Sequence, residues 1–269
     1  MSVMAPLIEA FQRAQAVLLY LDYDGTLVPL RRDPAMCPLS PALAAVLRRL
    51  HDRPGPPALD LAVISGRSLV DLRHQLGPAP QGIALAGNHG LEIASGGSSW
   101  SDPRAVALAP QLNAVAERLQ AELTAWPGAW LEHKGLSLSL HSRQLPASQR
   151  LILERQLQPL LAQIHHEGLF ILRRGRMVLE VRPAILHTKA DAVMWLEAAA
   201  QRRGLWPAGD PSVPLRLYVG DDDTDEDVFR LWPGVIGVRV GPGEPDTAAS
   251  YRLSGPAGVA QWLQQLADR

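Results

Sequence analysis

Two aspartates, Asp22 and Asp24, follow directly on a short apolar run at residues 17–21, and Gly25 comes next. The run predicts a buried strand, and Gly25 indicates a sharp turn just past its end. In open α/β sheets, ligands bind beyond the carboxyl ends of the strands. Two carboxylates at such a place can attack phosphorus, hold a metal ion and move a proton. An isolated pair of this kind is also typical of a simple turn, so the rest of the chain must decide.

Further polar groups stand at the ends of other predicted elements. Ser65 follows an apolar run at 61–64, Asp221 follows another at 215–219, and Lys189 begins a predicted helix behind Thr188 as its N-cap. Parallel strands bring their carboxyl ends to one edge of a sheet, so these groups are expected to meet there. Each alone has an ordinary explanation: a turn, a solvated lysine, or an acidic cap.

Together these residue types match the parts of phosphoryl transfer, which needs a nucleophile, neutralisation of the phosphoryl oxygens and a proton for the leaving group. Asp22 can be the nucleophile, and Asp24 the acid and later the base. Ser65 can donate to a phosphoryl oxygen, and Lys189 at a helix N-terminus can offset its charge. Asp221 and its neighbours can bind Mg²⁺, which prefers carboxylate oxygens.

Composition narrows the class of protein. The 269 residues are 47% hydrophobic and 20% charged, which fits one large domain or two small ones. The net charge is −1, so no broad basic field is available for nucleic acid, and no apolar run approaches the ~20 residues of a membrane-spanning helix. We expect no secretory signal at the start, and the single cysteine, Cys37, favours a reduced, cytoplasmic location.

The pattern of elements predicts one domain split by another. Strands alternate with helices up to about residue 90 and again after Pro183, which is typical of a doubly wound, Rossmann-like parallel sheet. Residues 95–99 read as a flexible connector. A helix followed by a hairpin then occurs twice, with helices at 105–125 and 147–167 and hairpins at 129–141 and 169–182. We therefore expect an α/β core of residues 1–94 and 186–269 and an inserted α+β cap of residues 95–185.

The predicted hairpins alternate apolar and polar side chains. Leu138 and Leu140 share one face while Ser139 and His141 share the other, and Glu180 belongs to a polar face in the second hairpin. One face is expected to pack on the helices of the cap. The polar face can meet either water or a ligand, and the pattern alone leaves both open.

At this point the chain resembles the haloacid dehalogenase (HAD) superfamily of phosphotransferases. Its four motifs match Asp22-Tyr23-Asp24-Gly25-Thr26, Ser65, Lys189 and Gly220-Asp221-Asp222. Within that superfamily the chain is similar over nearly its whole length to the trehalose-6-phosphate phosphatases. The stretches that carry this second resemblance are residues 65–67, 87–92, 131–137, 141–143, 178–183 and 220–229.

The resemblance implies Mg²⁺-dependent hydrolysis of trehalose 6-phosphate to trehalose and phosphate through an aspartyl-phosphate. It implies a catalytic set of Asp22, Asp24, Ser65 and Lys189. It implies metal binding by Asp22, Asp221 and Asp222 and by the backbone carbonyl of Asp24. Sugar binding is implied for Glu132, Lys134 and Glu180 in the cap and for Arg67, Asn88 and His89 in the core.

Several alternatives stay open at this stage. The same core and cap could serve another sugar phosphatase, acting on sucrose phosphate or a glycosyl-glycerate phosphate, or a non-catalytic sugar-phosphate sensor. Glu132 and Glu180 could instead form ion pairs within the cap, with Arg182 or Arg143. The chain departs from the family in having Ala190 where Gly commonly follows the lysine. We expect a small-molecule substrate, no nucleic acid or membrane partner, and a monomer.

Overall fold

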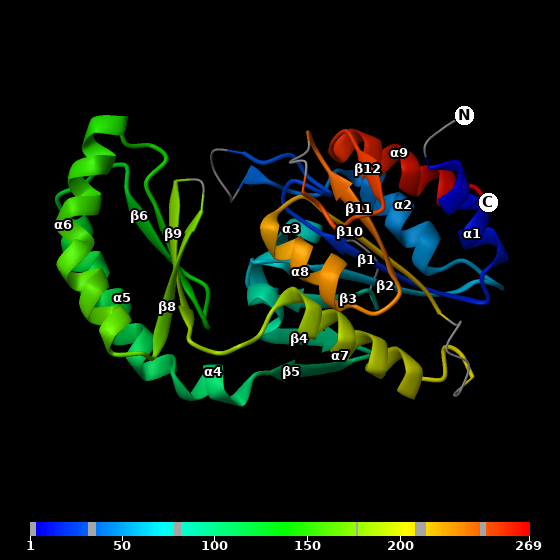
Figure 1. Cartoon of the computed structure of the whole chain (residues 1–269), viewed down its shortest axis with the longest axis horizontal. Helices are drawn as coiled ribbons and strands as arrows, with labels where there is room; N and C mark the ends of the chain where they lie inside the picture. The colour runs from blue at the N-terminus through cyan, green and yellow to red at the C-terminus, as the bar shows by residue number, and fades with distance from the viewer. Residues whose placement is uncertain (1–3, 32–35, 78–81, 176, 208–213, 243–245) are drawn as a thin grey trace. The chain divides into compact units, whose positions relative to one another are not determined.

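The structure, a computed structural model, describes residues 4–31, 36–77, 82–175, 177–207, 214–242 and 246–269. The chain folds into two compact units (Figure 1). We call Met1–Trp100 together with His187–Arg269 the core unit, and Ser101–Leu186 the insert. Among the described residues, no helix is both long and apolar enough to cross a membrane.

The core unit contains an eight-stranded sheet of order β12-β11-β10-β1-β2-β3-β4-β5. The strands from β12 to β3 run parallel, and β4 pairs antiparallel with β3. This confirms the predicted doubly wound parallel sheet. The strands are β1 (Ala16–Asp22), β2 (Ala58–Ile64), β3 (Ala84–Gly87), β4 (Glu92–Ser95), β5 (Ser98–Ser101), β10 (Leu215–Gly220), β11 (Val235–Val240) and β12 (Tyr251–Leu253).

Helices cover both faces of this sheet (Figure 1). Val17, Leu19 and Leu21 of β1 pack on one side, in a cluster with α1 (Ala5–Arg13), α2 (Pro41–His51), α3 (Leu69–Leu76) and α9 (Pro256–Ala267). Leu18 and Tyr20 point to the other side, where α7 (Lys189–Arg202) and α8 (Asp223–Leu231) pack. Since both faces are covered, β1 is apolar from Ala16 to Leu21 instead of alternating, and only its last residue, Asp22, is charged.

Side-chain caps define where the core helices begin. The Ser40 Oγ accepts a hydrogen bond from the Leu43 amide at 3.2 Å, and the Thr188 Oγ1 accepts one from the Ala190 amide at 3.2 Å. Asp191 completes a capping box by accepting from the Thr188 amide at 2.7 Å. The cap at Thr188 was predicted, and it makes Lys189 the first residue of α7.

The insert is an antiparallel sheet of order β6-β7-β9-β8 with helices on one face (Figure 1). Leu138, Leu140 and Val181 point to that face and join a leucine-rich cluster from α5 and α6. Arg176, where the sequence places the start of the last strand, lies outside the described residues. The elements are α4 (Pro103–Ala107), α5 (Ala109–Leu123), β6 (Trp130–His133), β7 (Leu138–His141), α6 (Ala147–His166), β8 (Phe170–Gly175) and β9 (Val178–Pro183).

Three local predictions were wrong. Residues 95–99 are not a connector: Gly96 and Gly97, with φ of 58° and 79°, make the turn between β4 and β5. The helix expected at 105–125 is interrupted at Leu108, because Pro110 lacks the amide that a continuous helix needs. The sequence also predicts a short helix over residues 228–231, but this helix begins at Asp223, five residues earlier.

The caps give a stability prediction. Thr188→Ala and Ser40→Ala should each lower the free energy of unfolding by about 1 kcal/mol, because each leaves a helix amide without its partner. Urea unfolding monitored by circular dichroism measures this. Ser148→Ala, an exposed serine inside α6, should change the free energy little or raise it, since alanine favours helix. Equal effects of all three substitutions would contradict the role given to the caps.

Candidate active site

The buried ammonium of Lys189 lies at the centre of the candidate site. Its Nζ donates to Asp22 Oδ1 at 2.7 Å and to Asp225 Oδ1 at 2.8 Å, and lies 3.8 Å from Asp222 Oδ1. Asp22 ends β1, Lys189 begins α7, and Asp222 is the N-cap of α8. The side chain of Lys189 is only 1% exposed, so the carboxylates replace the water that an ammonium would otherwise require.

The carboxylates around Lys189 form a group suited to a cation. Oxygens of Asp22, Asp221 and Asp225 lie within 4.8 Å of one another. The Oδ2 atom of Asp22 is buried and has no hydrogen-bond partner among the described residues. The backbone at Gly25, with φ of 86°, passes so close that a Cβ there would lie 2.0 Å from Asp221 Oδ2. An orphaned carboxylate oxygen beside a second carboxylate fits a hard divalent ion.

The electrostatics of the cluster show an excess of acid over base. Burial, together with repulsion from the neighbouring carboxylates, raises the pKa of Asp22 well above its usual range, although Lys189 opposes the shift. Burial and the charges of Asp225 and Asp222 raise the pKa of Asp221 to about 7. Burial lowers the pKa of Lys189, but attraction to Asp22 and the other carboxylates outweighs it and leaves that pKa raised. One ammonium is thus too little charge for the carboxylates it touches.

Asp225 holds the site together through four hydrogen bonds. Its Oδ1 accepts from Lys189 Nζ and from the Tyr218 hydroxyl at 2.8 Å, and its Oδ2 accepts from the amides of Asp221 and Asp222 at 2.9 and 3.0 Å. With both oxygens used twice, Asp225 positions the loop and the lysine more than it serves as a metal ligand. Asp225 was not among the site residues predicted from the sequence. Its spacing from Val228 and Phe229 on the buried face of α8 was the signal that could have found it.

Asp222 has a different setting from Asp221. Its side chain is 52% exposed, and its Oδ1 accepts from the amides of Thr224 and Asp225 as the cap of α8. Asp221 is less exposed, and its Oδ1 accepts from the Thr26 hydroxyl at 3.4 Å. The geometry therefore favours Asp221 over Asp222 for direct contact with a metal ion.

Asp24 is held by an arginine. Arg67 donates from Nε and Nη2 to the two oxygens of Asp24 at 2.6 and 2.7 Å, and from Nη1 to Asp71 Oδ2 at 2.6 Å. Ser65, at the end of β2, accepts from the Arg67 amide at 3.1 Å. Asp22 pairs with Ile64 in the sheet, so Ser65 and the two aspartates follow neighbouring strands, as the sequence predicted.

Asn88 and His89 follow β3 in a tight turn. Both residues have positive φ, 48° and 57°, which asparagine and histidine tolerate better than most residues. Asn88 donates to Glu92 Oε1 at 2.5 Å, and the same oxygen accepts from the Leu69 amide at 2.9 Å. The His89 ring packs on Gly66, where a Cβ would lie 2.5 Å from Nε2. The turn thus links the ends of β2 and β3.

The insert contains the three sugar-binding residues that the sequence placed in the predicted cap domain: Glu132, Lys134 and Glu180. Lys134 Nζ is 3.6 Å from Glu180 Oε1, and Arg182 Nε donates to Glu180 Oε2 at 2.8 Å, so the ion pair weighed as an alternative is present. Glu132 Oε2 lies 2.9 Å from His141 Nε2. Glu132 and Glu180 both stand opposite Ser139 in the strand register and therefore share the sheet face away from the helices.

Trp130 and His141 extend this polar face. Their rings stack with centroids 4.0 Å apart and an interplanar angle of 15°, on directly paired positions of β6 and β7. An aromatic ring beside acidic and basic groups is a common surface for a sugar, which presents both apolar and hydroxyl edges. Sequence reasoning placed His141 on the polar face but did not connect it with Trp130.

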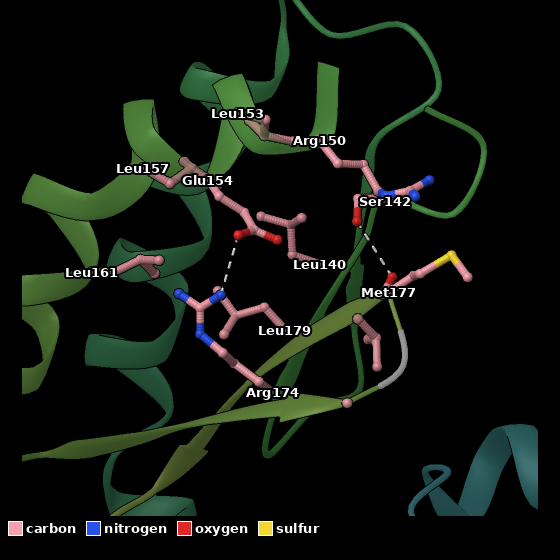
Figure 2. A pocket seen from close by; sticks show the side chains of 12 residues that line it. Leu140, Ser142, Arg150, Leu153, Glu154, Leu157, Leu161, Arg174, Met177 and Leu179 are labelled. Carbon is pink, nitrogen blue, oxygen red and sulfur yellow. Dashed lines mark hydrogen bonds and ion pairs between the residues drawn. The ribbon is translucent and has the colours of Figure 1, made fainter. Parts of the chain in front are cut away.

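A separate cavity of about 190 Å³ lies on the helical side of the insert sheet (Figure 2). Leucines from α6, β7 and β9 form much of its lining, and Arg174 pairs with Glu154 beside them at 3.3 Å. None of the predicted site residues lines it. Its residues are Leu140, Ser142, Arg150, Leu153, Glu154, Leu157, Leu161, Arg174, Gly175, Met177, Val178 and Leu179.

Comparisons with known proteins identify the family to which the chain is similar. The model of the family described as Trehalose-phosphatase matches residues 20–253. The chain is 32% identical over 260 residues to the trehalose-phosphate phosphatase of Mycobacterium tuberculosis, covering 94% of this chain and 62% of that protein. Two mycobacterial relatives that are 34% identical, named as uncharacterized glycosyl hydrolases, are much longer, and the chain spans 18% of their length.

Solved structures share the fold. The C-terminal domain of the trehalose-6-phosphate phosphatase of C. albicans superposes with a TM-score of 0.75 at 24% identity, over 100% of this chain and 97% of that one. A haloacid dehalogenase-like hydrolase from Bacteroides thetaiotaomicron superposes with a TM-score of 0.56 at 18% identity, over 93% and 99%. The chain therefore has the HAD-like hydrolase fold.

The raised pKa of Asp221 predicts a pH-dependent stability. The folded carboxyl binds its proton more tightly than the unfolded one, whose pKa is near 3.8, so this contribution is complete below about pH 4 and is lost as the pH rises through about 7. In metal-free buffer, the unsubstituted protein should therefore lose stability from this group as the pH rises from 4 to 8, whereas Asp221→Asn should not. Over that range the unfolding free energy of Asp221→Asn should rise by about 1–3 kcal/mol relative to that of the unsubstituted protein.

Urea unfolding in the presence of a chelator at several pH values measures this gain. Asp52→Asn, at an exposed aspartate, is the control and should show no such trend. A difference between Asp221→Asn and the unsubstituted protein that stays constant with pH would contradict the assignment.

Proposed function

The chain belongs to the trehalose-phosphatase family, and we propose that it hydrolyses trehalose 6-phosphate to trehalose and inorganic phosphate through an aspartyl-phosphate on Asp22. One observation carries the proposal: the Asp22 carboxylate lies at a strand end, held at one oxygen by Lys189 and with the other oxygen buried and unpartnered among the described residues. A fixed carboxylate with an available oxygen is suited to in-line attack on phosphorus.

In the first step, a carboxylate oxygen of Asp22 forms a bond to phosphorus while the bond from phosphorus to the sugar oxygen breaks. Asp24 gives its proton to that departing oxygen, so trehalose leaves as a neutral alcohol. In the second step, Asp24 takes a proton from water, the water oxygen bonds to phosphorus, and the bond between phosphorus and Asp22 breaks. Phosphate leaves, and both aspartates return to their starting states.

Lys189 and Ser65 hold the phosphoryl oxygens in this scheme. Lys189 already neutralises part of the charge on Asp22, and the helix N-terminus at which it stands favours an anion. The Ser65 oxygen accepts from the Arg67 amide, which leaves its O–H to donate to a phosphoryl oxygen. Both groups are buried and need little reorganisation when the substrate binds.

We further propose that the cluster holds Mg²⁺. Asp22 and Asp221 would bind it directly, the backbone carbonyl of Asp24 would add a third oxygen, and Asp222 would act through a bound water. The closeness of carboxylate oxygens of Asp22 and Asp221 and the acid excess of the cluster support this donor set. When bound, the ion would offset negative charge on the phosphoryl oxygens and on Asp22.

Sugar-binding residues are proposed for each unit by itself. We propose that Glu132, Lys134 and Glu180 of the insert hydrogen-bond the sugar hydroxyls, and that Arg67, Asn88 and His89 of the core do the same. In the insert, Lys134 Nζ lies 3.6 Å from Glu180 Oε1, and Arg182 also donates to Glu180, so charged groups gather on the polar face of this sheet. Sugar-binding sites use a few such placed polar groups to fix the orientation of the ligand.

The alternatives are less well supported. The family and its relatives do not favour sucrose phosphate or a glycosyl-glycerate phosphate as the substrate. A non-catalytic sensor would need neither a nucleophile nor an acid, nor a buried lysine that donates to the nucleophile. We propose that the protein is cytoplasmic and monomeric and that it has no nucleic-acid or membrane partner.

The first test is phosphate release from a panel of sugar phosphates, with Mg²⁺ or with a chelator. We expect strong preference for trehalose 6-phosphate and loss of activity in the chelator. Asp22→Asn should lower turnover by at least about a thousandfold, because the amide is a poor nucleophile. Asp52→Asn is the matched surface control. An active Asp22→Asn protein, or metal-dependent release from a different sugar phosphate only, would disprove the mechanism or the substrate respectively.

The second test separates sugar binding from phosphoryl transfer. Glu180→Ala should lower kcat/KM for trehalose 6-phosphate about tenfold to a hundredfold, since it removes charge-assisted hydrogen bonds to the sugar. The same change should alter hydrolysis of p-nitrophenyl phosphate, which has no sugar, by less than about twofold. Glu154→Ala, in the ion pair beside the insert cavity, should leave both substrates unchanged. Equal loss on both substrates in Glu180→Ala would remove Glu180 from the sugar site.

A further inference from the structure

Asp71 is a partly buried carboxylate that has no role in the mechanism above. It contacts Arg67, which does have one. It is the third residue of α3, and its Oδ2 accepts from Arg67 Nη1 at 2.6 Å. Asp24 accepts from the opposite side of the same guanidinium, at Nε and Nη2. Arg67 therefore binds two carboxylates through two separate edges of its planar fork.

Asp24 and Asp71 differ in what the reaction requires of their bonds to Arg67. In the proposed mechanism Asp24 must give a proton to the departing sugar oxygen, and it cannot do so while both of its oxygens face Arg67. The hydrogen bonds between Asp24 and Arg67 therefore have to open during each turnover. Asp71 has no such duty, and nothing in the reaction requires its bond to Arg67 to open.

Asp71 is itself held in place. The Ser68 hydroxyl oxygen accepts from the Asp71 amide at 3.2 Å as the cap of α3, and Gln75, one turn later, donates to Asp71 Oδ1 at 3.2 Å. The first turn of a helix also favours a negative charge. A carboxylate fixed on both its backbone and its second oxygen can act as a firm anchor.

Arg67 makes further contacts through its face and its backbone. Its guanidinium carbon lies 5.5 Å from the centre of the Tyr23 ring, and its carbonyl oxygen accepts from the Asn88 amide at 2.7 Å. With the face on Tyr23 and Nη1 on Asp71, the edge formed by Nε and Nη2 is the part of the guanidinium that changes partner when Asp24 turns away. Two parallel N–H donors on that edge suit a pair of sugar oxygens.

We propose that Asp71 is a positioning residue that keeps Arg67 in place when Asp24 leaves the ion pair, so that the same guanidinium first holds the acid and then faces the sugar. The inference rests on the proposed function, which supplies the need for Asp24 to move. It assigns Asp71 no contact with the substrate. Its effect is transmitted through Arg67, and it is specific to substrates whose leaving group needs both a proton and a sugar contact.

The kinetic test compares Asp71→Asn with the unsubstituted enzyme on trehalose 6-phosphate and on p-nitrophenyl phosphate, whose leaving group needs no proton. We expect kcat/KM for the sugar phosphate to fall about tenfold, as for loss of one charge-assisted hydrogen bond, and the aryl phosphate to change less than about twofold. Asp71→Glu should recover most of the loss, since it restores a carboxylate within reach of Arg67.

Glu197→Gln is the matched control. It also removes a partly buried carboxylate that accepts from an arginine, Arg216, but it stands eight residues along α7 from Lys189, about 12 Å away. It should lower stability without changing the ratio of the two substrates. A fall on both substrates alike in Asp71→Asn would show a merely structural role and overturn the inference.

A second readout does not depend on activity. The Arg67 Nε–H signal in nuclear magnetic resonance, assigned by its loss in Arg67→Lys, is followed in Asp24→Ala, where Nε has lost its own acceptor. Adding Asp71→Asn to Asp24→Ala should make this signal exchange with solvent about tenfold faster, because the guanidinium is then no longer anchored. Unchanged exchange would overturn the inference. If the unsubstituted protein fails to hydrolyse trehalose 6-phosphate, the proposed function fails, while this measurement still tests the anchor by itself.

Discussion

The ion cluster around Lys189 is the constraint on which the core unit depends. An ammonium that is 1% exposed can persist only if carboxylates take the place of water, and the two that do so are 167 and 36 residues away in the chain. Asp22 reaches Lys189 from the end of β1, and Asp225 reaches it from α8. The neighbouring positions of β1 and β10 in the sheet make this meeting possible.

The cluster is well supplied with hydrogen bonds, but its carboxylates carry more negative charge than Lys189 can neutralise. Asp225 satisfies its own oxygens by binding Lys189, Tyr218 and two backbone amides, and it thereby sets the loop that carries Asp221. Asp22 and Asp221 have no comparable compensation, which is why the pKa of each is raised. The burial and mutual repulsion that raise these pKa values also suit the two carboxylates to bind a cation.

The insert follows a simpler rule, in which one sheet has two different faces. Leu138 and Leu140 pack beneath α5 and α6, and the alternate positions turn Glu132, Ser139 and Glu180 to the other side. The helical face supplies the stability of the unit. The polar face then carries charged and aromatic groups that contact one another within the sheet.

By itself the sequence determined the class of fold, the strand ends that carry Asp22, Ser65 and Asp221, and the helix that begins at Lys189. These are local features: apolar runs, turn residues and caps act within a few neighbouring positions and so can be recognised along the chain. Even the polar face of the insert followed from simple alternation. The errors were also local, at Gly96-Gly97 and Pro110, where turn chemistry competes with longer patterns.

Only the tertiary structure decided which charges pair. That Arg67 would bind both Asp24 and Asp71, or that Asp225 would hold Lys189 and the following loop, depends on how strands and helices distant in sequence approach one another. A carboxylate looks the same in sequence whether it caps a helix, anchors an arginine or remains available for chemistry. Burial and the number of donors each oxygen receives separate these roles, and both quantities exist only once the chain has folded.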